Sequence, residues 1–264
     1  MCIIAAKTLG TDWPALDIIN NCCVNNPDGF AIAWNEDGEI KTFRTMDRAE
    51  FIARYNTIIH EVNPDTSAAI IHARWATHGS KKLENCHCWT GGGLAFAHNG
   101  VMSNIPNRDD MTDSETFFRD YFLPVYEKLG WDKAQLISRA IAGTNRLAWI
   151  DATGHIYLMG EWLKYQEQGR KGKLYFSNRG FQSSTSRNLF YTDSAFGRTQ
   201  EVRPRSAKPA GAAGGKKPSV GKYNSMDDLW PRLSKSTGEM NAKNTTEEKF
   251  NRYGALVIQR PSEA

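Results

Sequence analysis

The sequence has no long hydrophobic run, and it lacks a recognisable export signal. No apolar stretch approaches the roughly 18 residues that a membrane-spanning helix needs. The first residues also lack the basic segment followed by an apolar one that marks a secretory signal. We therefore expect a cytoplasmic chain that has no membrane partner.

Cysteine is scarce. The 264 residues include only five, and four of these lie in two close groups, at 22–23 and 86–88. A disulfide framework normally uses an even number of cysteines spaced along a short secreted chain. The odd count and the clustering argue against such a framework and indicate reduced thiols.

Net charge is also small, but it is unevenly distributed. The whole chain carries +4, whereas residues 203–264 hold 12 Lys and Arg against six Asp and Glu. The tail therefore carries +6 and residues 1–202 carry −2. We expect one domain over 1–202, followed by a basic tail over 203–264. Such a tail can bind nucleic acid or another acidic partner, although more often it is simply a solvated extension.

The tail has a composition that cannot bury a core. Residues 209–218 consist mainly of Ala, Gly, Lys and Pro, so we expect 203–264 to be largely flexible. Trp230 and the apolar residues 255–258 are exceptions. They are candidate docking elements for a partner protein, and residues 255–258 could instead form a last strand.

Residues 1–202 contain the periodic patterns of a layered α/β domain. The strands expected in the first 100 residues come before two consecutive helices, and further strands follow these helices. The expected helices cover residues 15–22, 47–60, 112–129 and 131–141. Thr112 and Glu115 have the spacing of a capping box, so we expect Thr112 to be the N-cap of the third helix. The expected strands cover residues 3–6, 30–34, 40–43, 67–72, 91–97, 146–150, 155–159, 173–177 and 189–191.

Cys2 is a candidate nucleophile because of its position. Its side chain is small enough for Met1 to be removed, which would leave a thiol and a free α-amine on one residue. The unperturbed pKa values of these groups are about 8.5 and about 7.7–8.0. At neutral pH the amine can therefore take the thiol proton, directly or through a water. The alternative is that Cys2 is only a small apolar residue on the first strand.

Further motifs lie at the ends of expected strands or at helix starts. Residues 28–34 read DGFAIAW, residues 71–79 read IHARWATHG, residues 98–100 read HNG, and residues 112–115 read TDSE. In this order after a cysteine at position 2, they closely resemble the glutaminase domain of class II glutamine amidotransferases, a family of N-terminal nucleophile hydrolases. The resemblance covers roughly residues 2–200.

This resemblance implies a fold and a reaction. The fold is the four-layer αββα sandwich of N-terminal nucleophile hydrolases. The reaction is hydrolysis of the glutamine side-chain amide through a γ-glutamyl thioester on Cys2, which releases glutamate and ammonia. We expect no cofactor. Nothing after residue 200 is long enough to be a synthase, so the ammonia would go to solution or to a separate synthase subunit in trans.

The resemblance also assigns the remaining site residues. The side-chain amide of Asn99 and the backbone N–H of Gly100 would stabilise the tetrahedral oxyanion. Arg74 suits the α-carboxylate of glutamine because a guanidinium can bind a carboxylate with two hydrogen bonds. Asp113 would bind the α-ammonium group. The same pocket in relatives is lined by the residues that correspond here to Trp75, Thr77 and His78.

Each of these residues also has a structural interpretation. Arg74 could be an ordinary ion-pair partner, Asp113 a residue that favours a helix N-terminus, and Asn99-Gly100 a type I′ turn. Their joint occurrence in family order favours the functional interpretation.

Residues 85–88 read NCHC, which invites a metal hypothesis with Cys22 and Cys23 as further ligands. A lone C-x-C pair is a weak zinc pattern. The family has proline where Cys88 stands, while Asn85 and His87 match. We therefore expect a structural loop and no metal.

Two other functions stay open. The substrate could be another γ-glutamyl amide or peptide, although Arg74 and Asp113 together favour free glutamine. Alternatively, a chain that keeps Met1 would have no free cysteine amine and would be a non-catalytic glutamine-binding relative.

Overall fold

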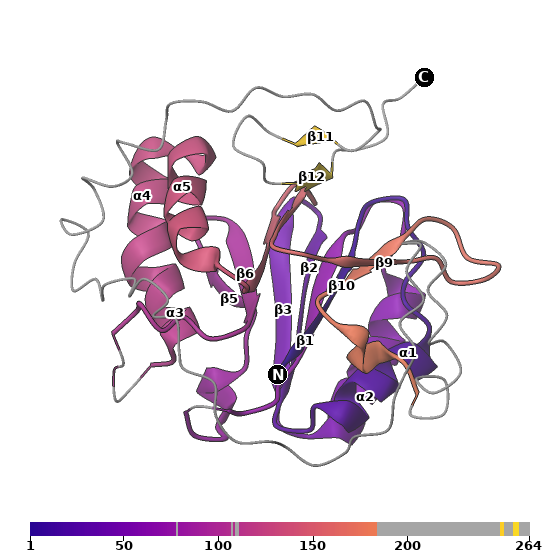
Figure 1. Ribbon diagram of the computed structural model, residues 1–264. Coiled ribbons are helices and arrows are strands. Elements are labelled where there is room, and N and C mark those ends of the chain that lie inside the picture. The colour runs from indigo at the N-terminus through magenta and orange to yellow at the C-terminus, as the bar shows by residue number, and fades with distance from the viewer. Residues whose placement is uncertain (78, 107, 109–110, 184–248, 251–255, 259–264) are drawn as a thin grey trace, which may run out of the picture.

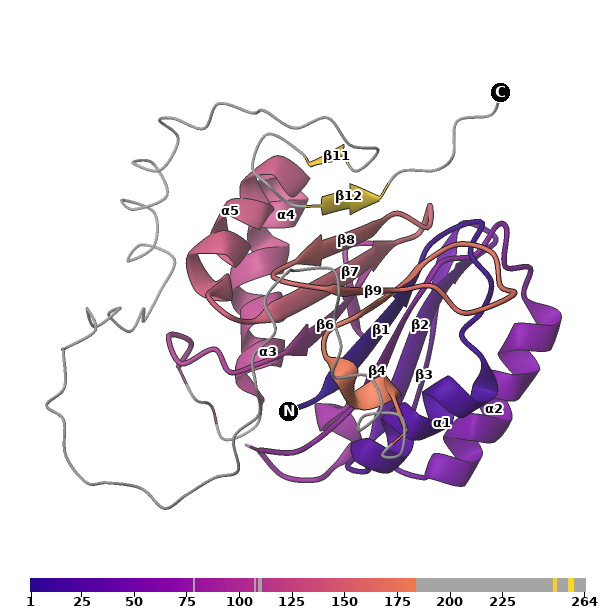
Figure 2. The same ribbon diagram turned by 45° about the vertical axis from the view of Figure 1, so that its right-hand side comes forward.

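The computed structural model describes residues 1–77, 79–106, 108, 111–183, 249–250 and 256–258. Two six-stranded sheets face each other, and helices cover the outer face of each (Figures 1 and 2). This arrangement confirms the predicted αββα sandwich. Among the described residues, no helix is both long and apolar enough to cross a bilayer.

The first sheet contains the N-terminal strand at its centre. Its order is β3-β2-β4-β1-β10-β9, and all neighbouring strands are antiparallel. The register of β1 with β4 places Ile3 opposite Ala73, so Cys2 lies next to the residues that follow β4. The strands are β1 (Ile3–Lys7), β2 (Phe30–Glu36), β3 (Glu39–Thr45), β4 (Ala69–Ala73), β9 (Leu163–Tyr165) and β10 (Leu174–Phe176).

The second sheet has the order β11-β12-β8-β7-β6-β5. Its strands are β5 (Trp89–Gly91), β6 (Leu94–Asn99), β7 (Arg146–Asp151), β8 (Ile156–Met159), β11 (Lys249–Phe250) and β12 (Leu256–Ile258). β12 pairs with β8, so part of the apolar segment 255–258 is a strand. The strand expected at 189–191 and Trp230 lie outside the described residues.

Two helices, α1 (Leu16–Asn25) and α2 (Arg48–Glu61), cover the first sheet. Asp47 begins α2, because its carboxylate accepts hydrogen bonds from the N–H groups of Ala49 and Glu50. The short helices η1 (Leu83–Asn85) and η3 (Arg179–Phe181) lie in connecting loops.

The second sheet is covered by α3 (Asp113–Thr116), the π-helical segment η2 (Phe117–Phe122), α4 (Leu123–Leu129) and α5 (Trp131–Ala142). Thr112 caps α3 as the sequence predicts, by accepting a hydrogen bond from Glu115 N–H. The one helix expected over 112–129 is interrupted by the wider π turns. Pro124 lies just after them, and its missing N–H removes a helical hydrogen bond.

Three apolar layers hold these elements together. Two lie between a sheet and its helices, and the third lies between the sheets. Along β1, Ile3 and Ala5 face the helices, while Ile4 and Ala6 face the second sheet. Both faces of β1 are buried, which explains why this strand reads as a continuous apolar run instead of an alternating one.

Candidate active site

The Cys2 thiol lies just before β1, at the end of the first sheet where β4 also ends, beside the segment that follows β4. The N–H of Trp75 lies 3.5 Å from Cys2 Sγ, and Sγ lies 3.6 Å from the Trp75 carbonyl oxygen. The backbone carbonyl of Cys2 accepts a 2.6 Å hydrogen bond from Asn178 Nδ2. Hydrogen bonds therefore hold the backbone of Cys2 and place the backbone of Trp75 beside its thiol, while Met1 is largely exposed.

Burial raises the pKa of the Cys2 thiol. The Trp75 backbone hydrogen bond, the N-terminal positive charge and the Arg74 guanidinium act in the opposite direction and only partly offset it. At neutral pH the thiol is therefore mostly protonated, so it needs a base before it can act as a nucleophile.

Arg74 follows β4 and is 3% exposed. Its Nη1 donates a 3.0 Å hydrogen bond to the carbonyl of Ser80, and Asn85 Nδ2 donates to the same oxygen at 2.8 Å. The guanidinium therefore lies beneath the loop that runs from residue 74 to residue 81. A buried cation at this point can attract an anionic group of a ligand.

Asp28 anchors the same loop. Its carboxylate accepts from Ala76 N–H at 2.9 Å and pairs with Lys81 Nζ at 2.6 Å. Desolvation opposes ionisation of Asp28, but the Lys81 and Ala76 hydrogen bonds outweigh it and lower the pKa of the carboxyl. Trp75 and Thr77 on this loop are exposed, and His78 lies outside the described residues.

Asn99 ends β6, on the opposite sheet, and Gly100 directly follows it. Asn99 still pairs with Arg146 of β7, so these two residues do not form a hairpin turn. Asn99 Nδ2 donates a 2.9 Å hydrogen bond to Ser177 Oγ. Ser177 Oγ also accepts a 2.8 Å hydrogen bond from the N–H of Ile4 on β1. One hydroxyl group thus connects the strand that carries Cys2 with the strand that carries Asn99.

Gly100 has a φ of +151°, a backbone conformation that favours glycine. A Cβ at this position would collide with the side-chain amide of Asn145. That amide is needed elsewhere, because its Oδ1 lies 2.8 Å from His98 Nε2. Glycine is therefore required here by packing against Asn145.

Asp113 begins α3 and already accepts hydrogen bonds from its own surroundings. Its Oδ2 accepts from Met102 N–H at 2.7 Å, and its Oδ1 accepts from Ser114 N–H at 2.8 Å. Ser114 Oγ lies 2.7 Å from His98 Nδ1. Through Ser114, Asp113 is therefore connected to the same segment, 98–100, that carries Asn99.

The histidine of the NCHC segment has a structural role. The His87 ring stacks on His72 with centroids 3.8 Å apart, and its Nδ1 accepts a 3.1 Å hydrogen bond from His98 N–H. Burial lowers the pKa of both stacked rings. In the part of the chain that the structure describes, no three His, Cys, Asp or Glu side chains could jointly hold a metal ion.

The structure also reveals residues that the sequence analysis missed. Ser177 was expected to end a strand, and Asn178 was not singled out. Both follow β10, which is antiparallel to β1, so they reach the edge where Cys2 lies. The sequence does show a polar Ser-Asn pair directly after an apolar strand. That this pair lies beside Cys2 follows only from the pairing of β10 with β1.

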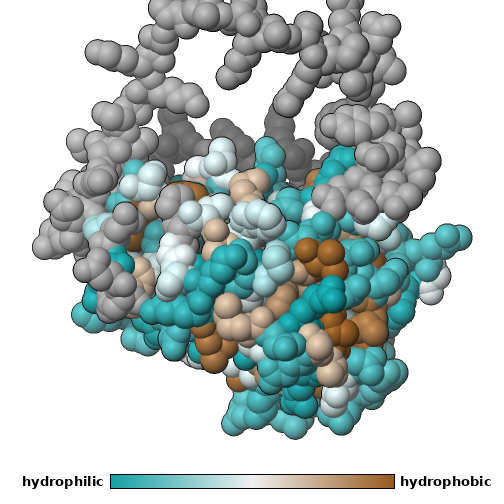
Figure 3. All heavy atoms as spheres, turned by 90° about the horizontal axis from the view of Figure 1, so that it is seen from below, coloured by the Kyte–Doolittle hydropathy of each residue, from teal (hydrophilic) through white to brown (hydrophobic). Residues whose placement is uncertain are grey.

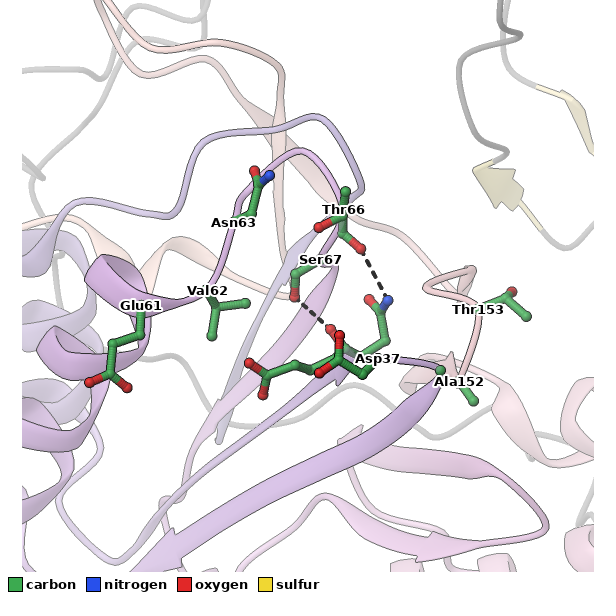
Figure 4. A pocket seen from close by; sticks show the side chains of 11 residues that line it. Asp37, Glu61, Val62, Asn63, Thr66, Ser67, Ala152 and Thr153 are labelled. Carbon is green, nitrogen blue, oxygen red and sulfur yellow. Dashed lines mark hydrogen bonds between the residues drawn. The ribbon is translucent and has the colours of Figure 1, made fainter.

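The sequence-predicted residues do not line the cavity of about 630 Å³ shown in Figure 4. That cavity lies where β2 ends and β4 begins, at the opposite end of these strands from Cys2. Its polar groups bond to one another: Ser67 Oγ donates to the carbonyl of Asn35, and Asn35 Nδ2 donates to that of Thr66 (Figure 4). Figure 3 shows the molecule from below, where small hydrophobic groups lie among hydrophilic ones.

Comparison with known proteins finds similarity to one family over the N-terminal part of the chain. The family described as "Glutamine amidotransferases class-II" matches residues 1–130. A Haemophilus influenzae protein, described as a candidate glutamine amidotransferase, is 29% identical over 151 residues, which are 52% of this chain and 50% of that protein. The glutamine–fructose-6-phosphate aminotransferase of Neisseria meningitidis is 36% identical over 79 residues, which are 30% of this chain and 12% of that protein.

A solved structure, a glutamine aminotransferase class-II domain protein from Silicibacter pomeroyi, shares 20% identity with a TM-score of 0.42. The alignment covers 67% of this chain and 88% of that one. Among the sequence relatives, the matched part of this chain spans 50% of the Haemophilus influenzae protein and 12% of the Neisseria meningitidis aminotransferase.

Alkylation of Cys2 tests the electrostatics of the site. Since burial raises the pKa of this thiol, we expect its reaction with iodoacetamide, in a chain that retains Met1, to be slow at neutral pH. The rate should still be rising with pH above about 8.5, the ordinary pKa of a cysteine. Timed labelling followed by peptide mapping measures the rate, with the buried Cys88 as an unlabelled internal control. A rate that levels off below that pH would contradict this description of the thiol.

Proposed function

We propose that this chain hydrolyses the side-chain amide of glutamine through a thioester on Cys2, because residues 1–130 match the class II glutamine amidotransferases and a protein described as a candidate glutamine amidotransferase is 29% identical over 151 residues. Glutamate and ammonia are the products. The proposal depends chiefly on one observation, the hydroxyl of Ser177 that connects the strand of Cys2 to the amide of Asn99. That connection supports the proposal, because it brings the Cys2 end of β1 and the side chain of Asn99 to the same end of the sandwich.

The reaction begins with removal of Met1, which frees the α-amine of Cys2. The amine takes the thiol proton, and the thiolate attacks the δ-carbonyl carbon of glutamine. The tetrahedral intermediate collapses as the α-ammonium group protonates the leaving nitrogen, and ammonia departs. Water, deprotonated by the same amine, then hydrolyses the thioester to glutamate. Since burial raises the pKa of the thiol, an adjacent base is essential to this scheme.

The oxyanion of the intermediate needs hydrogen-bond donors that are already in place. Asn99, at the end of β6, supplies a side-chain amide, and Gly100 supplies a backbone N–H. A single donor of this kind typically lowers the barrier by about 2.7–4 kcal/mol. The His98–Asn145 contact and the required glycine at position 100 hold this segment in place.

Two opposite charges would bind the other end of glutamine. Arg74, a buried cation, suits the α-carboxylate, and Asp113 suits the α-ammonium group. Trp75 and Thr77 belong to the exposed loop beside Arg74 and would line the substrate pocket, and His78 is proposed as a further pocket residue on the resemblance alone. A ligand that carries both α-groups fits this pair of charges, which favours free glutamine over an internal residue of a peptide.

The ammonia that this reaction releases needs an acceptor. We propose that residues 1–202 form the glutaminase domain and that a separate synthase subunit receives the ammonia. The basic residues 203–264 are the candidate docking segment for that subunit.

Replacement of the nucleophile tests the reaction directly. Cys2→Ala should abolish glutamine hydrolysis while leaving the thermal unfolding midpoint within a few degrees of the wild-type value, because only a thiol at the sheet edge is lost. Glutamate and ammonia release are both measured, with free glutamine and with γ-glutamyl amides as substrates. Cys22→Ala, in helix α1 on the outer face of the first sheet, is the matched control and should stay active. Substantial residual activity in Cys2→Ala would rule out the thioester.

Removal of the negative charge at position 113 tests the substrate assignment. Asp113→Asn keeps one of the two oxygens that accept from the N–H groups of Met102 and Ser114 and loses the charge. Hydrogen bonds to charged groups are worth about 1.5–3 kcal/mol, so KM for glutamine should rise roughly tenfold to a hundredfold, with a smaller change in kcat.

The matched control is Asp120→Asn, on the neighbouring η2 segment. Asp120 is exposed and pairs with Arg108, so its replacement should leave KM unchanged. An unchanged KM in Asp113→Asn would show that another group binds the α-ammonium.

A further inference from the structure

Ser177 occupies a position where a hydroxyl group has two separate partners. It directly follows β10 and is 2% exposed. Its Oγ accepts from Ile4 N–H at 2.8 Å and from Asn99 Nδ2 at 2.9 Å, while its own N–H donates to the Ile4 carbonyl at 2.9 Å. Ser177 thus extends the pairing of β10 with β1 and reaches across to the second sheet.

The hydrogen bonds of Asn99 are incomplete in this arrangement. Its Nδ2 donates to Ser177 Oγ, whereas its Oδ1 is buried and has no hydrogen-bond partner among the residues that the structure describes. The Ser177 hydroxyl hydrogen, for its part, has no acceptor within that same part of the chain. A buried carbonyl oxygen without a partner is costly, and a hydroxyl group can donate as well as accept.

Rotation of the Asn99 amide by half a turn would satisfy both groups. The Ser177 O–H would then donate to Asn99 Oδ1 while Ser177 Oγ still accepts from Ile4 N–H. This rotation would also release Nδ2 from Ser177 and place it where Oδ1 now lies, a buried position from which one of its hydrogens could donate to a substrate oxygen. Such a chain of hydrogen bonds polarises its members in the same direction, which strengthens the Nδ2 donor at its end.

We propose that Ser177 is a positioning residue for the oxyanion site: its hydroxyl group orients the Asn99 amide so that Nδ2 faces the oxyanion formed at Cys2. The inference rests on the proposed glutaminase function and adds a residue to it. Ser177 acts through Asn99 and does not touch the substrate. Because the same hydroxyl accepts from the strand that carries Cys2, it also fixes the distance between the nucleophile and the donor.

The test compares Ser177→Ala with Ser67→Ala in the full-length protein. Ser67 is a matched control, since it is a buried serine at the opposite end of the first sheet whose Oγ donates to a backbone carbonyl. Ser177→Ala should lower kcat for glutamine by about tenfold to a hundredfold, because a misoriented donor is partly lost. KM should stay within about twofold, since Arg74 and Asp113 are untouched, and Ser67→Ala should show neither change.

Two further measurements separate positioning from a general loss of structure. The rate of Cys2 alkylation by iodoacetamide should be the same in Ser177→Ala and wild type, because alkylation forms no oxyanion. In the Asn99→Ala background, Ser177→Ala should cause no further fall in kcat, since a residue that acts only through Asn99 has nothing left to orient. If Ser177→Ala does not fold, Ser177→Cys takes its place in the kinetic comparisons, because it keeps the size but donates only weakly.

The outcomes are distinguishable. A kcat equal to that of Ser67→Ala, or a further loss of the same size in the Asn99→Ala background, would overturn the role of Ser177 and leave the glutaminase proposal intact. A slower alkylation of Cys2 that accounts for the whole loss would mean that Ser177 only holds β1 in place. A wild-type protein that does not hydrolyse glutamine would overturn the proposed function itself.

Discussion

The antiparallel pairing of β1 with β4 and β10 is the interaction on which the site depends. It is fixed by backbone hydrogen bonds and by side chains that are buried on both faces of β1. A shift of one residue in this register would move Ile3 and Ile4 to the wrong faces of the sheet. The register therefore determines that Cys2 emerges beside Arg74 and that Ser177 reaches the N–H of Ile4.

The site is divided among elements that are far apart in the sequence. The first sheet carries Cys2 and Arg74, the second carries Asn99, and α3 carries Asp113. Hydrogen bonds connect them in two places: at Ser177, between the sheets, and at Ser114, between α3 and His98. Because these connecting groups are buried, they hold the segments that carry Cys2, Asn99 and Asp113 together without substrate, as the proposed oxyanion stabilisation would require.

Much of the fold could be predicted because its signals are local. The helix cap at Thr112 and the buried strand at residues 30–34 depend on neighbouring residues, and both occur as expected. The strand expected over 91–97 was only partly right. Gly92 and Gly93 adopt positive φ values and form a turn that separates β5 from β6. The short edge strand β9 was missed, because three half-exposed residues carry no clear period.

The site was less predictable than the fold. The motifs that contain Cys2, Arg74, Asn99 and Asp113 can be read directly from the sequence, and the structure brings their elements to one end of the sandwich. The contribution of Ser177 cannot be read in this way, because it depends on contacts with Ile4 and Asn99, 173 and 78 residues away. No local pattern encodes such a contact, which exists only once both sheets have formed.

The central claim is that the processed chain forms a covalent intermediate with glutamine on its first residue. Acid quenching of the protein during turnover, followed by intact-mass measurement and peptide mapping, tests it most directly. The account predicts a chain that lacks Met1 and carries one glutamyl group on the N-terminal cysteine peptide, and the adduct should disappear when glutamine is exhausted. Active protein that retains Met1, or a glutamyl group on any other cysteine, would contradict it.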